Sequence, residues 1–192
     1  MSEAGQTDEQ LVAAAQKAMS GDVRAFDQLI RRHQEKVFTN CRYLSGSADD
    51  AQDLAQEVFI KAYFSLARFE SRSSFGTWIQ RIKVNHCLNF LRRKKGKTLV
   101  DVQDTSIANE PELRVDPAAG ERLISEQEQK SIKAALDQMP DTLRVALIMR
   151  DMDGFSYQEI ADDLGIGLSA AKMRIKRSRE AFREIYKSSA DR

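Results

Sequence analysis

The stretch FSYQEIADDLGIGLSAAKMRIKR, residues 155–177, decides the fold of the C-terminal part of this chain. Ser156 and Glu159 have the S-x-x-E spacing of a capping box, which predicts that a helix starts here. Gly165 and Gly167 predict a sharp turn after this helix, because glycine adopts backbone angles that other residues avoid. A second helix is predicted to begin near Ser169. Two helices joined by such a turn are typical of a helix-turn-helix motif.

The second helix of this motif is predicted to be cationic outside one apolar face. Its inward face would carry Ala171, Ile175, Ser178 and Phe182. Its other faces would carry Lys172, Arg174, Lys176, Arg177, Arg179 and Arg183. An ordinary antiparallel helix pair with a solvated basic face is the simpler alternative for this stretch. The agreement between the capping box, the glycine turn and the cationic second helix favours DNA binding, with that helix in a major groove.

Charge is segregated along the chain, although the whole is almost neutral. The 192 residues include 30 basic and 29 acidic side chains, which gives a formal net charge of +1. From Ser71 to Val100 there are cations but no Asp or Glu, whereas acids dominate from Asp101 to Glu128. The helix-turn-helix is basic again. Two basic blocks separated by an acidic segment predict two polyanion-binding surfaces.

Hydrophobic periodicity predicts an all-α protein without a sheet, because no segment alternates convincingly with a period of two. Helical patterns precede the helix-turn-helix at Thr7–Met19, 22–44, 48–69, Phe75–Lys95, Glu121–Met139 and, after a predicted cap at Asp141, up to Asp153. Residues 96–120 have no sustained periodicity and contain two prolines and several acids, which predicts a flexible acidic linker. The predicted organisation is therefore two small helical domains, residues 1–95 and 121–192, joined by residues 96–120.

The cysteines and histidines do not predict a metal site. Cys41 and Cys87 form no C-x-x-C motif, and His33 and His86 are the only histidines in the chain. Free cysteines inside helical patterns usually behave as buried small apolar residues, and we expect the same here.

An enzyme acting on nucleic acid would need a carboxylate cluster near the basic surface. The nearest carboxylates, Asp50, Asp53 and Glu57, fall on a predicted helical stripe without histidine. We therefore expect no catalytic residue, no cofactor, no bound metal and no small-molecule substrate. No apolar run approaches the roughly 18 residues of a membrane span, and no signal peptide is recognisable, so we expect a cytoplasmic protein.

The acidic stripe itself has a simple explanation. Asp50, Asp53 and Glu57 fall at spacings of three and four beside Gln56. Taken alone, such a stripe is a solvated helix face, partly favoured by the helix dipole near the N-terminus.

The basic block from Ser71 to Val100 has the chemistry of a single-strand binder. A loop of small hydroxyl residues opens it, and its helix carries Trp78, Asn85 and Asn89 before the cationic tail Arg92–Lys95. Aromatic rings stack on bases, amides read base edges and cations hold phosphates. Trp78 has a simpler explanation as a core residue, but core packing does not explain the absence of acids from this block.

The order and spacing of these motifs resemble an extracytoplasmic-function (ECF) sigma factor of the sigma-70 family, the promoter-recognition subunit of bacterial RNA polymerase. The resemblance covers about Asp8 to Tyr186. The segment Asp53–Tyr63, DLAQEVFIKAY, is similar to the core-binding helix of region 2. The segment Phe69–Arg92 is similar to the reader of the −10 promoter element. Leu136-x-x-Met139-Pro140 and the helix-turn-helix look like region 4, the reader of the −35 element.

The resemblance implies an alternative sigma factor that directs core polymerase to promoters and melts the −10 element, without being an enzyme. The implied contacts with the polymerase are Asp50, Asp53, Gln56 and Glu57. The implied −10 contacts, several of them around a base turned out of the non-template strand, are Phe69, Ser73, Ser74, Trp78, Asn85, Asn89, Arg92 and Arg93. The implied −35 contacts are Ser169, Lys172, Met173, Arg174, Lys176 and Arg177. Arg174 and Arg179 would lie closer to the phosphate backbone.

The implied partners are bacterial core RNA polymerase, promoter DNA and an anti-sigma factor. Anti-sigma factors of this family are often membrane-bound, and one of this kind would hold the protein at the inner membrane. The start of the recognition helix, Ser169-Ala170-Ala171, departs from the Gly-Thr-Val that is frequent in the family.

A stand-alone helix-turn-helix regulator is the alternative. In that case residues 8–95 would bind a small molecule or dimerise, and only the C-terminal domain would bind DNA. The sequence has neither a pocket signature nor dimer heptads, and this alternative leaves the basic block from Ser71 to Val100 without a role.

Overall fold

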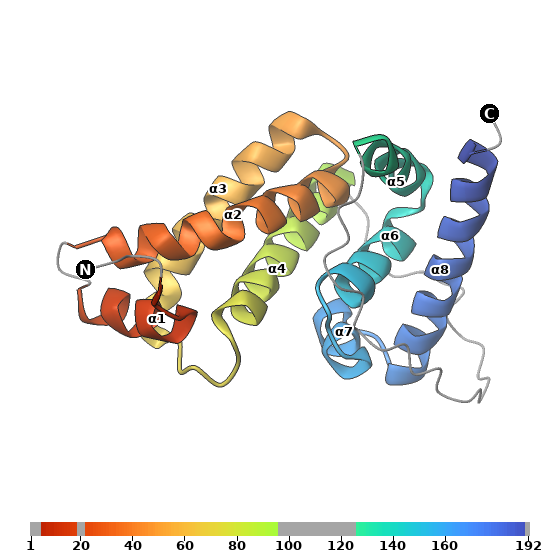
Figure 1. The fold of residues 1–192 in the computed structure, drawn as a ribbon. Coiled ribbons are helices and arrows are strands. Elements are labelled where there is room, and N and C mark those ends of the chain that lie inside the picture. The colour runs from red at the N-terminus through yellow and green to blue at the C-terminus, as the bar shows by residue number, and fades with distance from the viewer. Residues whose placement is uncertain (1–4, 19–21, 96–125, 191–192) are drawn as a thin grey trace. The chain divides into compact units, whose positions relative to one another are not determined.

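A computed structural model describes residues 5–18, 22–95 and 126–190 of the chain (Figure 1). Every regular element within those residues is helical, which confirms the all-α fold class. The chain divides into two units, Met1–Lys95 and Gly96–Arg192, as expected for two helical domains. The predicted linker, residues 96–120, lies outside the described residues.

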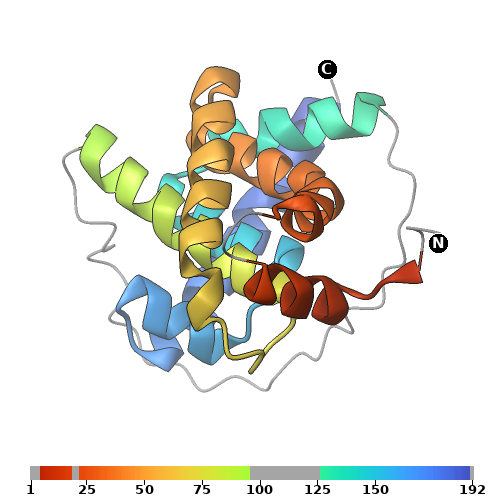
Figure 2. The same ribbon diagram turned by 90° about the vertical axis from the view of Figure 1, so that its left-hand side faces the viewer.

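The first unit is a cluster of helices around α2. Its described elements are α1 (Asp8–Lys17), α2 (Arg24–Ser45), α3 (Ala48–Ser65), a 3-10 turn (Leu66–Arg68) and α4 (Phe75–Lys95). Helix α2 packs against α1, α3 and α4, and α3 also packs against α4 (Figures 1 and 2). The observed bounds of α4 are the predicted ones, whereas α3 gives way to the 3-10 turn before the predicted end at residue 69.

Side-chain caps start α1 and α3. At α1 the Gln10 amide N–H donates to Thr7 Oγ1 at 3.4 Å, and Thr7 N–H donates to Gln10 Oε1 at 3.0 Å, so the T-x-x-Q spacing of the sequence forms a capping box. At α3 the Asp50 amide N–H donates to Ser47 Oγ at 3.3 Å. The Ser47 amide donates to Ser45 Oγ at 3.3 Å, and the Asp50 carboxylate pairs with Lys94 on α4.

The interior of the first unit is apolar and includes both cysteines. Its best-buried side chains include Leu11, Leu29, Val37, Val58, Leu66, Ile79 and Leu88. Cys41 on α2 and Cys87 on α4 are free and buried, with their sulfur atoms 3.8 Å apart. The prediction that they are buried small apolar residues is confirmed. Within the described ranges, no group of three or more His, Cys, Asp or Glu side chains could hold a metal ion.

The second unit packs three shorter helices against one long helix. Its described elements are α5 (Glu126–Gln138), α6 (Asp141–Leu147), a π-helical turn (Ile148–Met152), α7 (Tyr157–Leu164) and α8 (Leu168–Ala190). Helix α8 packs against α5, α6 and α7. The predicted cap at Asp141 is wrong, because Pro140 occupies the cap position and Asp141 is the first helical residue. The Asp141 carboxylate instead pairs with Arg144 at 2.8 Å.

None of the helices in the described ranges combines the length and the apolar character that a membrane span requires.

Candidate nucleic-acid and protein-binding surfaces

The helix-turn-helix is fixed by local hydrogen bonds. Ser156 Oγ accepts from the Glu159 amide at 3.2 Å, and the Glu159 carboxylate accepts from the Ser156 amide at 2.9 Å, so the predicted capping box is present. Gly165 ends α7 with φ +68°, and the Ile166 amide donates to the Ala161 carbonyl at 3.0 Å. This bond pattern terminates a helix and turns the chain sharply. Helix α8 then begins one residue before the predicted start near Ser169.

The inward face of α8 is close to the predicted one, with one addition. Ala171, Ile175 and Ser178 are each at most 1% exposed, and Phe182 is half-buried. Arg174 is also only 1% exposed, so its predicted position on an exposed face is wrong. Arg174 follows Ala171 by three residues and precedes Ser178 by four, which places it beside the inward face. Spacing permits this burial, and the packing of α5, α6 and α7 against α8 decides it.

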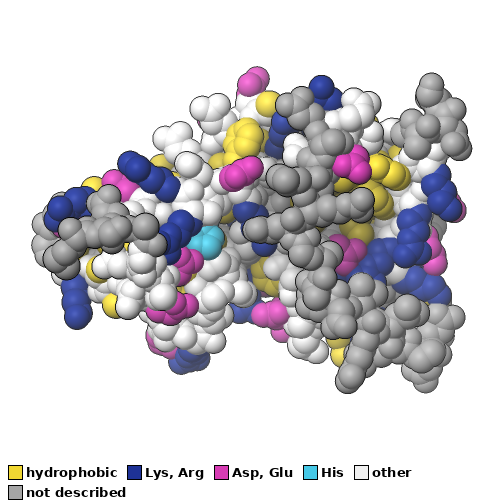
Figure 3. Space-filling view, in the orientation of Figure 1, with side chains coloured by type: hydrophobic (Ala, Val, Ile, Leu, Met, Phe, Trp, Pro, Cys, Tyr) yellow, Lys and Arg dark blue, Asp and Glu magenta, His cyan; other side chains and the backbone are white. Residues whose placement is uncertain are grey.

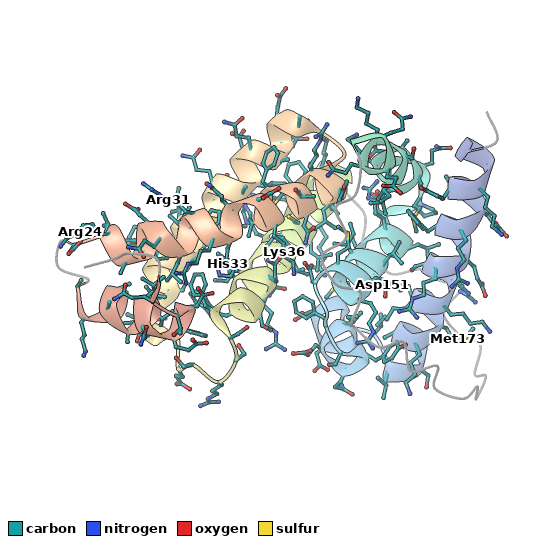
Figure 4. All side chains as sticks on the ribbon, viewed as in Figure 1. Arg24, Arg31, His33, Lys36, Asp151 and Met173 are labelled. Atoms are coloured by element: carbon teal, nitrogen blue, oxygen red, sulfur yellow. The ribbon has the colours of Figure 1, made fainter. Side chains whose placement is uncertain are left out.

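The opposite face of α8 is the surface that could enter a groove of DNA. Ser169, Lys172 and Lys176 are exposed, and Met173 and Arg177 are half-buried. Basic side chains gather over α8 in the space-filling view (Figure 3). Met173 lies on the outer side of this helix (Figure 4). These five residues, the α8 basic face, are those of the predicted −35 contacts that remain accessible after Arg174 is removed from the set.

Within the second unit, an acidic residue holds the Arg179 side chain in place. Arg179 Nε and Nη2 donate to the two carboxylate oxygens of Asp151, at 2.9 and 2.5 Å, and Asp151 lies beside α8 in Figure 4. These hydrogen bonds raise the pKa of Arg179 above its usual value. The sequence contains no signal for this pair, because the two residues are 28 positions apart. A guanidinium held in this way is less available for the predicted contact with the DNA backbone.

Two cationic side chains lie over the ring of Tyr157, at the start of α7. The sequence pattern did not predict that these two cations are neighbours. The Arg150 guanidinium lies 4.5 Å from the ring centroid and Lys172 Nζ lies 5.8 Å from it. Arg150 Nη1 also donates to the Phe155 carbonyl at 2.7 Å, which fixes its orientation. Cations over an aromatic face are attracted by the ring quadrupole. Tyr157 therefore concentrates positive charge at the edge of the α8 basic face.

In the first unit the predicted acidic stripe lies on α3. Asp53, Gln56 and Glu57 are exposed and Asp50 is half-buried. Asp50 Oδ2 lies 2.6 Å from Lys94 Nζ, so one end of the stripe is paired with the end of α4. Further along, Glu57 Oε2 lies 2.8 Å from His86 Nε2. Helix α4 thus contacts the stripe at two points, which no local sequence pattern indicated.

His86 is the buried neighbour of Glu57, and its pKa lies below the ordinary value. Burial is the largest influence and lowers the pKa of His86, the Glu57 carboxylate opposes this, and Lys61 and Arg93 lower the pKa further. His86 Nε2 is fully enclosed but makes no hydrogen bond of good geometry, although Glu57 is close. The contact is therefore a close approach of a buried imidazole to an exposed carboxylate.

The polar side chains predicted to contact a single strand are exposed along α4 and the loop before it. Ser73, Ser74, Asn85, Asn89, Arg92 and Arg93 all reach the surface. Ser74 also has a structural role, because its Oγ accepts from the Thr77 amide at 3.1 Å in the first turn of α4. Arg92 Nη1 donates weakly to Asn89 Oδ1 at 3.4 Å, which places the amide and the cation side by side.

The aromatic members of this set are less accessible than the polar ones. Phe69 is 8% exposed and lies behind Trp78, with ring centroids 4.7 Å apart. Phe75 is buried and completes the cluster, 5.6 Å from Trp78. Trp78 is half-buried, so it is neither a simple core residue nor a free ring. The predicted placement of the Phe69 ring on the DNA-facing surface is not what the structure shows.

Helix α2 carries exposed cations that the sequence pattern did not identify. Arg24, Arg31 and Lys36 are exposed along it (Figure 4). Asp27 and Glu35 lie between these cations in the sequence, so the sequence of this helix shows no block of a single charge.

Comparisons with known proteins assign both units. Residues 29–97 match the family model for sigma-70 region 2, and residues 129–182 match that for sigma-70 region 4. The chain is 34% identical over 179 residues to the RNA polymerase sigma-H factor of Pseudomonas aeruginosa, with 91% of each chain covered. It is also 34% identical over 181 residues to the ECF RNA polymerase sigma-E factor of Escherichia coli K12, with 92% of each chain covered.

Two solved structures are similar in fold. The sigma factor RpoE of Bartonella quintana, solved with the anti-sigma factor NepR, is 27% identical with a TM-score of 0.59, over 86% of this chain and 98% of that one. CnrH, solved in complex with the cytosolic domain of CnrY, has a TM-score of 0.60 over 94% of this chain and 97% of that one, at 23% identity. The region 2 match gives the N-terminal unit a sigma-factor identity, which counts against a sensor or dimerisation domain. The chain belongs to the ECF group of the sigma-70 family and is an alternative, non-enzymatic RNA polymerase sigma factor.

Proposed function

We propose that this sigma factor brings core RNA polymerase to promoters through three surfaces. The acidic stripe of α3 contacts the polymerase, the exposed amides and cations of α4 hold the melted −10 strand, and the α8 basic face reads the −35 duplex. Residues 1–95 would act as region 2, residues 121–192 as region 4, and residues 96–120 as the connection between them.

The observation that supports this proposal most is the presence of an exposed, cation-bearing reading helix in each unit. Asn85 and Asn89 on α4 and Lys172 on α8 are all exposed. Amides can read base edges and cations neutralise phosphates, so each helix has the chemistry for one promoter element. In the first unit α4 packs on α3, so the groups proposed to bind the polymerase and those proposed to bind the single strand would share one small domain.

Capture of a −10 base by α4 would favour strand separation. A base turned out of the stack loses stacking energy, which contacts in the protein offset. The half-buried ring of Trp78, supported by Phe69 behind it, offers one face for such a contact. No covalent bond is made or broken in this process, so the chain needs no catalytic group.

We also propose an anti-sigma factor as a partner and the cytoplasm as the site of action. RpoE of Bartonella quintana was solved with an anti-sigma factor, and CnrH with the cytosolic domain of CnrY. A membrane-bound anti-sigma factor would hold this chain at the inner membrane until it is released.

The direct test uses purified bacterial core RNA polymerase. Co-purification of the full chain with the polymerase, followed by run-off transcription of a genomic library, should give start sites that are absent without the chain. Alignment of the new start sites should give −35 and −10 motifs. A chain that binds the polymerase but adds no start site would contradict the promoter-reading roles of α4 and α8.

A further inference from the structure

Helix α1 lies beside the loop that leads into α4 (Figure 2). We call residues 69–74, between the 3-10 turn and α4, the entry loop. It contains Phe69, Ser73 and Ser74 of the proposed strand-binding surface. Among the described residues other than glycine, Ser71 alone has a positive φ, at +54°. This backbone conformation is strained in a residue with a side chain, so it persists only where surrounding contacts hold the loop.

Gln16 of α1 fixes the first end of the entry loop. Its Nε2 donates to the Leu66 carbonyl at 2.9 Å and to the Phe69 carbonyl at 2.8 Å. One side chain can hold both carbonyls because an amide nitrogen carries two hydrogens. Phe69 in turn lies against Trp78, with ring centroids 4.7 Å apart. Gln16 therefore fixes the backbone of the residue whose ring supports Trp78.

Asp8 of α1 acts on the second end of the entry loop through His33 of α2. Asp8 Oδ2 lies 2.7 Å from His33 Nε2, and Asp8 Oδ1 accepts from Arg32 Nη1 at 2.8 Å. The ring centroids of His33 and Phe75 are 5.2 Å apart. At Gly76 an added Cβ would lie only 3.3 Å from His33 Cε1, so the imidazole approaches the backbone of α4 closely. The orientation of this ring, which α1 fixes, thus determines where α4 begins.

We infer that α1 is a positioning element for strand binding. Through Gln16 and through Asp8 it fixes both ends of the entry loop, and with them the aromatic cluster of Phe69, Phe75 and Trp78, before DNA binds. The inference rests on the proposed capture of a −10 base by α4 and adds residues that act through other side chains. A surface that is already in its bound geometry loses less conformational freedom on binding, which increases affinity.

The first measurement is made on the free chain with Gln16→Met. Methionine is neutral and about as long as glutamine, but it cannot donate to the two carbonyls. Trp78 is the only tryptophan in the chain, so its fluorescence reports on the aromatic cluster. Gln16→Met should change the emission of Trp78 and increase its quenching by acrylamide. Gln10→Ala is the matched control and should leave both unchanged, because Gln10 is an amide of the same helix that supports the start of α1.

The second measurement is the affinity of the holoenzyme for a non-template −10 oligonucleotide of a promoter identified by run-off transcription. The same strand is also tested with one abasic position moved through the element. The unchanged chain should lose affinity when the captured base is missing. Gln16→Met should bind the complete strand about tenfold more weakly, as expected for two lost hydrogen bonds. It should bind the strand that lacks this base as well as the unchanged chain does, and core-polymerase binding should not change.

Asp8→Ala tests the other end of the entry loop and should give the same pattern, because it releases His33. If both variants bind every strand as the unchanged chain does, the positioning role of α1 is wrong and base capture by α4 stands. If the unchanged chain is indifferent to every abasic position, base capture is wrong and the positioning role falls with it. An equal loss for all strands and for the polymerase would show general destabilisation and would also overturn the inference.

Discussion

Glu57 of α3 and His86 of α4 face each other with Oε2 and Nε2 2.8 Å apart, although the carboxylate is 57% exposed and the imidazole only 7%. One partner is thus available to a binding protein while the other is part of the interior. Helix α4 also carries Asn85 and Asn89, next in sequence to the histidine or three residues beyond it. The proposed polymerase-binding and strand-binding surfaces of the first unit are therefore connected through a single buried ring.

His86 should make stability depend on pH. Burial lowers its pKa in the folded chain below the ordinary value of about 6.5. As the pH falls below that value, the unfolded chain binds a proton more readily than the folded one, so the free energy of unfolding should decrease. Urea titrations between pH 5 and 7 should show this decrease, and His86→Gln should flatten it.

The carboxylates whose pKa is lowered, Asp8 and Asp22, lose their stabilising effect only at lower pH, because their ordinary value is 3.8. Their contribution therefore does not overlap with the window of His86. A slope that persists unchanged in His86→Gln would show that another group is responsible.

Removal of the acidic stripe should separate polymerase binding from DNA binding. Asp53→Ala with Glu57→Ala should weaken core-polymerase binding by at least about tenfold, because charges in an interface lose their partners. Binding of a −35 duplex by the same full-length variant should be unchanged, since the stripe lies in the other unit. Equal loss of both activities would indicate misfolding or a wrong assignment.

Asn85 should matter for promoter opening rather than for assembly. Asn85→Ala removes an exposed amide from α4 without disturbing the interior. Permanganate footprinting of the holoenzyme at a cognate promoter should show reduced reactivity in the −10 region, with core binding unaffected. Gln52→Ala, which removes an exposed amide from α3, serves as the control and should open the promoter normally.

Lys172 should contribute to −35 binding electrostatically. Lys172→Ala should weaken binding to a −35 duplex and lower the slope of log K against log salt by about 1, the value for one lost phosphate contact. Lys187→Ala removes an exposed cation in the last turn of the same helix and is the matched control. Equal effects of the two substitutions would indicate general attraction rather than a defined groove-facing surface.

Gly165 should be needed for its backbone conformation alone. Its φ is +68°, and an added Cβ would meet no atom within 4 Å. Gly165→Ala should therefore lower the free energy of unfolding by about 1 kcal/mol through backbone strain. Gly167→Ala is the control, since the space around Gly167 is equally open and its φ lies outside the strained range. Thermal unfolding of both variants distinguishes backbone strain at Gly165 from the general effect of replacing a glycine by alanine.

The sequence by itself determined the features that depend on neighbours along the chain. The capping boxes at Thr7 and Ser156, the glycine turn after α7 and the bounds of α4 all arise from bonds that span a few residues. Such interactions can be read from spacing because both partners lie within one or two helical turns. The order of the motifs also sufficed to indicate the sigma-70 family.

Only the tertiary structure decided which side chains remain available on the surface. Arg174 is buried, Arg179 is held by Asp151, and Phe64 protrudes. The spacing of residues along a helix does not distinguish these side chains from other cations and other apolar residues. The pairs Asp50–Lys94 and Glu57–His86 both join α3 to α4, and their members lie 44 and 29 residues apart in the chain. Exposure and long-range pairing depend on how helices pack against each other, and residues distant in sequence set that packing, so they could not be derived from local pattern.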